Sequence, residues 1–404
     1  MQYEKLITKK TTRSVSIAGS KVASVRINNS LTTVARAFEY DKIGVFAANG
    51  VCDEVSLLDQ AQCNLKQGIP YPCRLAADLH RSEDYSAPVI ADDELVERCK
   101  ALVSRLNQAY PEYIFSNKIN TEHIDVSYSN SSNTSYGYKG SNLLISLCIK
   151  SKDSANIMDL SYGDYCLGYN EDIVVSDIGK LLAVYKNKLE ISEDLPVLIP
   201  ASELEIALGD VVAEKYMSGA GLFAGKLGQK IFDSKLNVEV NRRPGNKRNL
   251  PFFDAEGTVL SGDSFPVVQE GVLCGLLTNR RSAVKYGLPL SGNANAEFDA
   301  VPSPGIGGIR VVPGSRALKD AVGGKAIYVA VTSGGDMTPS GDISLPVMLA
   351  YLYEDGKLIG TLPQFTITGN IFDVLGGNFI CAAENDVFEG VDETLIASKF
   401  TINK

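Results

Sequence analysis

Histidine is almost absent from this sequence: only His80 and His123 occur, both in the N-terminal half and neither beside a second ligand at metal-site spacing. Zinc sites of the H-E-x-x-H type need two imidazoles on one helical face and a carboxylate. The residues after His123 therefore cannot build such a site alone, and we expect both histidines to be structural or exposed. A Ser-His-Asp site could form only across domains, and the G-x-S-x-G nucleophile elbow is missing.

Long apolar runs are also missing. The longest candidate, residues 345–353, is interrupted by Pro346, whereas a membrane-spanning helix needs roughly 18 to 20 apolar residues. The first residues carry positive charge but no apolar block or cleavage site of a secretory signal follows. The eight cysteines form no C-x-x-C pair and no dense disulfide framework. These absences predict a cytoplasmic protein with no membrane segment.

Nucleotide-binding motifs are incomplete. The segment 221–227 is one residue short of a phosphate loop and has Leu227 where the metal-binding hydroxyl belongs. Residues 305–308 are glycine-rich but follow Pro304 and lack the strand and helix of a dinucleotide fingerprint, so we interpret them as a turn.

Basic residues are fewer than acidic ones, and the formal net charge is −9. Such a surface repels phosphate backbones, so we expect no nucleic-acid partner. One basic run, residues 241–248, contains Arg242, Arg243, Lys247 and Arg248. It could hold a carboxylate or phosphate through arginine forks, or it could be a solvated loop around a Pro-Gly turn.

The N-terminal half alternates strand and helix patterns. Residues 13–46 alternate polar and apolar positions, which predicts an antiparallel hairpin or meander. Asp53 is expected to cap a helix that ends at Gly68, with an apolar face of Val55, Leu58, Ala61 and Leu65. A second helix is predicted around Leu95 to Leu106 and a third over residues 171–188. Between them, residues 113–165 predict strands separated by a Ser/Asn/Gly-rich tract at 127–141.

The C-terminal half predicts mostly short antiparallel strands in a sandwich or barrel. The fold class is therefore α+β: an N-terminal α/β domain of helices on an antiparallel sheet, residues 1–190, and a mostly antiparallel β domain, residues 191–404. Ser202 and Glu205 form a capping box that predicts a helix with Leu204, Leu208 and Val211 on its apolar side.

Ordered motifs in this half resemble the TldD/PmbA family of peptide-processing proteins, also described as modulators of DNA gyrase. Residues 221–228 are similar to the family's S-x-F-x-G-x-(I/L)-G segment, although Gly221 replaces the serine. The other similar segments follow in the family's order: 253–258 (D-D-E-G-T turn), 270–275 ((E/D)-G-(I/V)-L-x-G hairpin), 279–286 with 291–293, 340–342, 354–357, 367–370 and 384–386. Together they span roughly residues 200 to 386, while the N-terminal half matches loosely and lacks the family's opening helix.

The resemblance implies a branch within the family. The TldD branch carries H-E-x-x-x-H before the S-x-F-x-G segment, and a count back from Phe223 places this motif on Leu204, Glu205 and Gly209. The chain also ends soon after Asp386, before the family's cysteine-bearing tail. The sequence therefore resembles the TldE (PmbA) branch, the metal-free subunit that pairs with a TldD-type protease. Glu205 keeps the general-base identity, but the capping role explains it better.

The resemblance implies a non-catalytic subunit of a cytoplasmic metalloprotease complex that processes peptides, with no catalytic residue, metal or cofactor on this chain and zinc on a TldD-type partner. Whether the chain has enzymatic activity alone stays open. Arg242, Arg243, Asn293 and Glu205 are candidates for contacts with unfolded peptides or with the partner. Two alternatives remain: a homodimeric peptide-binding or scaffold protein, and a metallopeptidase with a non-standard metal site.

Overall fold

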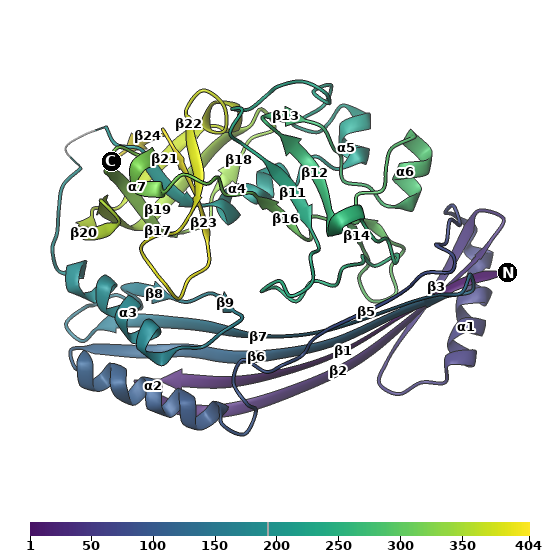
Figure 1. Cartoon of the computed structure of the whole chain (residues 1–404), viewed down its shortest axis with the longest axis horizontal. Coiled ribbons are helices and arrows are strands. Elements are labelled where there is room, and N and C mark those ends of the chain that lie inside the picture. Colours follow the sequence, from purple (N-terminus) through teal and green to yellow (C-terminus); the bar gives the residue numbers. More distant parts are fainter. Residues whose placement is uncertain (192–193) are drawn as a thin grey trace.

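A long curved sheet, antiparallel except for the parallel pair β5–β7, forms one side of the molecule in the computed structural model, which describes residues 1–191 and 194–404 (Figure 1). Its strand order is β4-β3-β2-β1-β6-β7-β5, and β8 and β9 also pair with β7. The strands are β1 (Gln2–Ala18), β2 (Lys21–Glu39), β3 (Lys42–Asn49), β4 (Ile69–Pro70), β5 (His80–Tyr85), β6 (Tyr113–Asn130), β7 (Thr134–Ser151), β8 (Leu160–Tyr162) and β9 (Tyr165–Cys166). The meander predicted over residues 13–46 is confirmed.

The Ser/Asn/Gly-rich tract at 127–141 is not the connection that we expected. β6 and β7 continue through it and only residues 131–133 form the turn, with Asn133 in the left-handed region. Cross-strand neighbours on both sides supply the hydrogen bonds that hold these polar residues in strands, since β6 pairs with both β1 and β7. Tertiary pairing thus overrides the turn propensity of the tract.

Three helices pack on this sheet: α1 (Glu54–Cys63), α2 (Leu95–Ala109) and α3 (Glu171–Tyr185). The predicted apolar face of α2 is buried as expected, and the Asp53 side chain caps α1 by accepting a hydrogen bond from the Ser56 amide. The predicted face of α1 is partly wrong, because Val55 is 67% exposed while Leu57 and Ala61 are buried. α1 ends at Cys63, and a 3-10 turn over Asn64–Gln67 carries the chain to Gly68.

The C-terminal part lies above the long sheet in Figure 1 and contains three further sheets. The largest is built from β10 (Val197–Pro200), β17 (Lys325–Thr332), β18 (Asp336–Met337), β19 (Asp342–Glu354), β20 (Lys357–Leu362), β21 (Phe365–Asn370), β22 (Phe379–Glu384), β23 (Thr394–Ser398) and β24 (Thr401–Asn403). A second contains β11 (Val238–Asn241), β12 (Ser264–Gln269), β13 (Val272–Leu273) and β16 (Ile309–Val311), and β14 (Ala294–Asn295) pairs with β15 (Ser303–Pro304). The helices are α4 (Ala201–Leu208), α5 (Ala213–Ser218), α6 (Arg280–Tyr286), α7 (Leu318–Ala321) and α8 (Ile371–Val374).

The predicted class, helices with antiparallel sheets, is confirmed. Each sheet has two ends in its strand order, so a closed barrel is excluded for the described part of the C-terminal half. α4 begins at Ala201, so Ser202 lies inside its first turn rather than at the N-cap that the capping box predicted.

Both faces of the largest sheet are buried, which explains the strand pattern of β17. Ile327 and Val329 point into a core shared with β11 and β12, whereas Ala326 and Tyr328 point into a second core. That second core also contains Phe115 of β6 and residues of α2 and α3, so the long sheet and the C-terminal part are joined by apolar packing. The predicted division at 190/191 stays a prediction, and residues 192–193 lie outside the described residues.

No helix among the described residues is long and apolar enough to span a bilayer.

Candidate peptide-binding cavity

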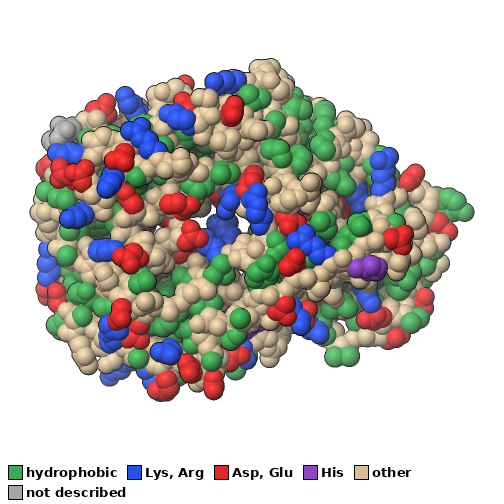
Figure 2. All heavy atoms as spheres, viewed as in Figure 1, with side chains coloured by type: hydrophobic (Ala, Val, Ile, Leu, Met, Phe, Trp, Pro, Cys, Tyr) green, Lys and Arg blue, Asp and Glu red, His purple; other side chains and the backbone are tan. Residues whose placement is uncertain are grey.

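A cavity of about 370 Å³ lies where the C-terminal part faces the end of the long sheet. Its wall is formed by α4, by β16, by the loop after β11, by the end of β22 and by the start of β23 with the residues before it, together with Asp164 and Leu167 from the N-terminal half. Figure 2 shows an opening near the middle of this face, with Lys, Arg, Asp and Glu side chains around it. The cavity is therefore a charged space between two halves of the chain.

Glu205 projects from α4 into this cavity, because Leu204 beside it on the helix turns into the apolar core. Burial raises the pKa of the Glu205 carboxyl, and the charge of Arg248 is the strongest influence that opposes the rise. Glu205 is thus a half-buried carboxyl that faces positive side chains.

Two further carboxyls share the cavity, Glu384 and Glu393. Burial, and after it the charge of Asp164, raise the pKa of Glu393 to about 7, while the charge of Lys247 opposes the rise. Burial also raises the pKa of Glu384. Glu393 therefore changes charge near neutral pH, so the charge of the cavity depends on pH there.

The basic side of the cavity comes from the run that the sequence singled out. Lys247 donates to the Asp164 carboxylate and to the Asp392 carbonyl, and it thereby joins the two halves of the chain. Arg248 is exposed and lines the cavity, and its guanidinium makes no ion pair or hydrogen bond with the described residues. An unpaired guanidinium in a charged cavity is suited to bind a carboxylate or a backbone carbonyl.

The four candidate residues from the sequence do not all meet here; only Glu205 lines the cavity. Arg243 lies outside it, where its Nη1 donates to Glu239 at 2.7 Å. Arg242 is buried, and its guanidinium donates to the carbonyls of Phe253, at 3.0 Å, and Gly292. These contacts position loops behind the cavity.

Asn293 is buried beside the Arg242 contact to Gly292. Its amide nitrogen donates to the Gly307 carbonyl at 2.7 Å, so it fastens the loop before β16. In this conformation neither Arg242 nor Asn293 reaches the cavity, although both support its wall.

Sequence reasoning missed Glu393 and Asp164 altogether. Both lie in loops with no periodic or motif signal, and only the folded chain brings them together. Lys247 and Arg248 were visible as part of the basic run, but their separation from Arg242 and Arg243 required the structure. The turn around Gly245 points the two pairs in different directions.

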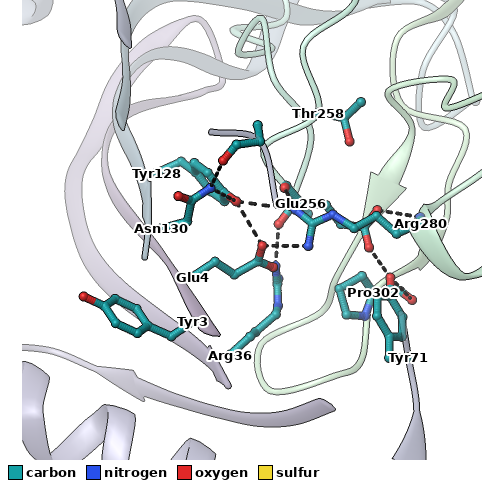
Figure 3. Close-up of polar contacts among 12 residues, drawn as sticks. Tyr3, Glu4, Arg36, Tyr71, Tyr128, Asn130, Glu256, Thr258, Arg280 and Pro302 are labelled. Carbon is teal, nitrogen blue, oxygen red and sulfur yellow. Dashed lines mark hydrogen bonds and ion pairs between the residues drawn. The ribbon is translucent and has the colours of Figure 1, made fainter. Parts of the chain in front are cut away.

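A buried polar network next to α6 fixes the long sheet to the C-terminal part (Figure 3). The Glu4 carboxylate of β1 accepts from Arg36 of β2 and from Arg280 of α6, both at 2.8 Å, and from the Tyr128 hydroxyl at 3.0 Å. Burial alone would raise the pKa of Glu4, but Arg280 and Arg36 outweigh it and lower the pKa. Glu4 is thus the shared counter-ion of two buried arginines.

Glu256 completes this network from the C-terminal side. It accepts from the Arg280 amide at 2.9 Å and from the Tyr71 hydroxyl. Burial raises the pKa of Glu256, although the Arg280 charge opposes the rise. Because Tyr71 belongs to the N-terminal half, its contact with Glu256 also connects the N-terminal half to the C-terminal part.

Comparison with known proteins identifies the same region as the motifs do. Residues 201–397 match the profile of the PmbA/TldA metallopeptidase C-terminal domain. This chain carries the C-terminal domain of the TldD/PmbA family. The resemblance seen in the sequence is thereby confirmed, and α4 with its Glu205 opens the matched region.

Solved structures of similar fold cover nearly the whole chain. TldE from Thermococcus kodakarensis has a TM-score of 0.79 at 16% identity and covers 100% of this chain and 97% of that one. A protein described as a modulator of a DNA gyrase from Thermotoga maritima also has a TM-score of 0.79 at 16% identity, covering 99% and 96%. At this identity the likeness shows a shared fold.

Two archaeal relatives named as metalloproteases are similar over a shorter region. The protein of Methanothermobacter thermautotrophicus is 25% identical over 173 residues, which are 42% of this chain and 37% of the relative. The protein of Methanocaldococcus jannaschii is 24% identical over 166 residues, 40% of this chain and 36% of the relative. The matched region thus spans little more than a third of each relative, and the chain is related to metalloproteases.

The family's zinc does not fit the residues of this chain. The positions that the count back from Phe223 assigns to the two histidines of H-E-x-x-x-H are Leu204, which is buried in the core, and Gly209, which follows α4. Neither side chain has an atom that binds a metal. Within the described ranges, no group of three or more His, Cys, Asp and Glu residues is arranged to hold a metal ion. His80 and His123 lie on the long sheet, where the His80 ring is hydrogen-bonded to the Ser135 hydroxyl and the His123 ring to the Asp92 carboxylate.

Proposed function

We propose that this chain is a non-catalytic, TldE-like subunit of a cytoplasmic metalloprotease that processes peptides. In this proposal the hydrolytic zinc is on a TldD-type partner, and this chain contributes a wall of the peptide chamber. The observation that carries the proposal is that Leu204 of α4 and Gly209, the residue after α4, occupy the positions where the zinc-binding branch has histidines.

The cavity beside α4 supports a role in peptide binding. It combines carboxyls (Glu205, Glu393) with a guanidinium (Arg248) that has no partner among the described residues. Peptides offer both kinds of complement, because they have backbone amides and a terminal ammonium as well as carbonyls and a terminal carboxylate. A cavity lined by both charge types can therefore hold an extended peptide without recognition of one side chain.

The test is co-expression of the chain with a TldD-type subunit, followed by size-exclusion chromatography and cleavage of an unstructured peptide. We expect a complex that cleaves the peptide, while this chain alone does not. If no complex forms and the mixture is inactive, the subunit proposal fails. A stable homodimer that binds peptides without cleavage would favour the scaffold alternative.

Variants of the complex test the cavity itself. Arg248→Ala should raise the KM for the peptide roughly tenfold, because a hydrogen bond to a charged group contributes about 1.5–3 kcal/mol. The matched control is Arg74→Ala, since Arg74 is also exposed and lies outside the cavity. Equal KM values for the two variants would remove the cavity from the peptide path without affecting the subunit proposal.

A further inference from the structure

The first half of strand β2, residues 21–31, pairs with a neighbouring strand of the described chain on one side only, and we call its other side the open edge. On one side β2 pairs with β1 along its whole length, from Lys21 to Phe38. On the other side β3 covers only the part from Thr32 to Glu39. Within the described residues no strand pairs with this second edge between Lys21 and Leu31. An unpaired edge of this length is a template for a further strand.

The backbone groups along this edge have a defined direction. The Gly50 amide donates to the Leu31 carbonyl at 2.8 Å, so Leu31 faces the side of β3. Because strand residues alternate in direction, Ile27 and Asn29 also direct their amide and carbonyl groups to the open side. A segment that continues the line of β3 beyond Asn49 would pair with them and run antiparallel to β2.

The side chains around the open edge are apolar on one face. Val25 and Ile27, two residues apart on β2, are 47% and 57% exposed. Val25 stands opposite Val15 of β1, which is buried in the core under α2. An added strand with apolar residues on this face would therefore extend an existing covered surface.

The opposite face of the edge is positively charged. Lys21 and Arg26 are the only charged residues from 21 to 31, and neither has an ion pair with a described residue. The net charge of the chain is −9, so this basic strand contrasts with its surroundings. A second copy that paired symmetrically along the whole open edge, residues 21–31, would place Arg26 opposite its own counterpart, and like charges directly opposite each other on two strands are destabilising.

We infer that the open edge of β2 binds an acidic, extended segment of another polypeptide by antiparallel strand addition. The segment places apolar residues beside Val25 and Ile27 and carboxylates beside Arg26. Main-chain hydrogen bonds give affinity in this mode, and the alternation of side chains gives selectivity. This inference goes beyond the proposed function and does not depend on it, because the edge lies outside the α4 cavity.

The probe is a labelled ten-residue peptide of alternating valine and glutamate, with the valine-lysine peptide as its matched control. Fluorescence anisotropy should show saturable binding of the glutamate peptide, at least tenfold tighter than the lysine peptide and weaker at high salt. Hydrogen exchange of the segment that contains Ile27 and Asn29 should slow at least tenfold at saturation, whereas exchange at α4 should not change.

Two variants locate the site. Ile27→Pro removes an amide that faces the open side and keeps the ladder to β1, and Ile27→Val is its control. Arg26→Glu reverses the charge, and Lys319→Glu, exposed on α7, is its control. Ile27→Pro and Arg26→Glu should each weaken binding at least tenfold, with melting temperatures close to wild type, and the controls should bind normally.

Several results would overturn the inference. These are the absence of saturable binding, equal binding of the lysine peptide, or Ile27→Pro binding as tightly as Ile27→Val. A dimer of the chain that dissociates with Ile27→Pro would assign the edge to a second copy and would also overturn it.

Discussion

The substitution Glu4→Gln should be among the most destabilising single changes in this chain. Glu4 is buried and is the shared counter-ion of Arg36 and Arg280, and glutamine keeps its shape but removes the charge. The Arg36 Nη1 also donates to the Ala255 carbonyl, but its Nε and Nη2 have no hydrogen-bond partner among the described residues, and Glu4 is the carboxylate that pairs with it. The variant therefore leaves buried positive charge without compensation.

Removal of one partner from a buried ion pair costs about 3–5 kcal/mol. For a chain of 404 residues the melting entropy is roughly 0.85 kcal/mol per kelvin, so this cost corresponds to about 4–6 °C in melting temperature. Urea unfolding and thermal melting at pH 7 measure both quantities. Because the pKa of Glu4 is lowered in the folded protein, its contribution is present above the ordinary carboxyl pKa and is lost as the pH falls.

The matched control is Glu54→Gln, which removes a carboxylate that pairs with Lys5 but is 52% exposed. Such surface pairs contribute at most about 1 kcal/mol. If Glu4→Gln lowers the free energy of unfolding no more than Glu54→Gln does, the buried network does not hold the long sheet and the C-terminal part together, and the prediction is refuted.

Three further predictions concern the cavity and α1. Burial raises the pKa of Glu393 to about 7, so the free energy of unfolding of the wild type should fall by up to roughly 3 kcal/mol as the pH rises from about 4.5 to 7. Glu393→Gln should remove this pH dependence, and urea unfolding across the same pH range measures it. Leu57→Ala should cost about 2–4 kcal/mol and Val55→Ala less than about 0.5 kcal/mol, and a larger cost for Val55→Ala than for Leu57→Ala would contradict this packing of α1. Gly44→Ala would place a methyl group 2.0 Å from the Ala61 carbonyl oxygen, so it should lower the free energy of unfolding by at least about 2 kcal/mol and speed hydrogen exchange in α1. A variant that melts like the wild type would contradict this packing.

Much of the fold could be predicted because its signals are local. α2 was evident from its apolar spacing, and Asp53 from its position before a helical pattern. The polar tract at 127–141 was misassigned because its conformation depends on neighbouring strands far away in the sequence. Val55 was misplaced for a similar reason, since α1 has two candidate apolar faces and the contact with β2 and β3 selects the one with Leu57.

The candidate site was predictable only where a motif marked it. Glu205 was found through the segment that precedes Phe223, and it does line a cavity. Arg242 and Asn293 were polar residues near turns, a pattern that does not distinguish a ligand contact from a loop support. Glu393 had no local signal, because its environment is made by Asp164 and Lys247 from distant parts of the chain.

Zinc quantification on the purified chain tests the central claim most directly. The chain would be incubated with excess zinc at neutral pH, freed of loosely bound metal by gel filtration, and analysed alone and in complex with a TldD-type subunit. We predict no stoichiometric zinc on the isolated chain and one zinc ion for each partner subunit in the complex. One tightly bound zinc ion for each isolated chain, lost together with peptide cleavage on chelation, would contradict the account.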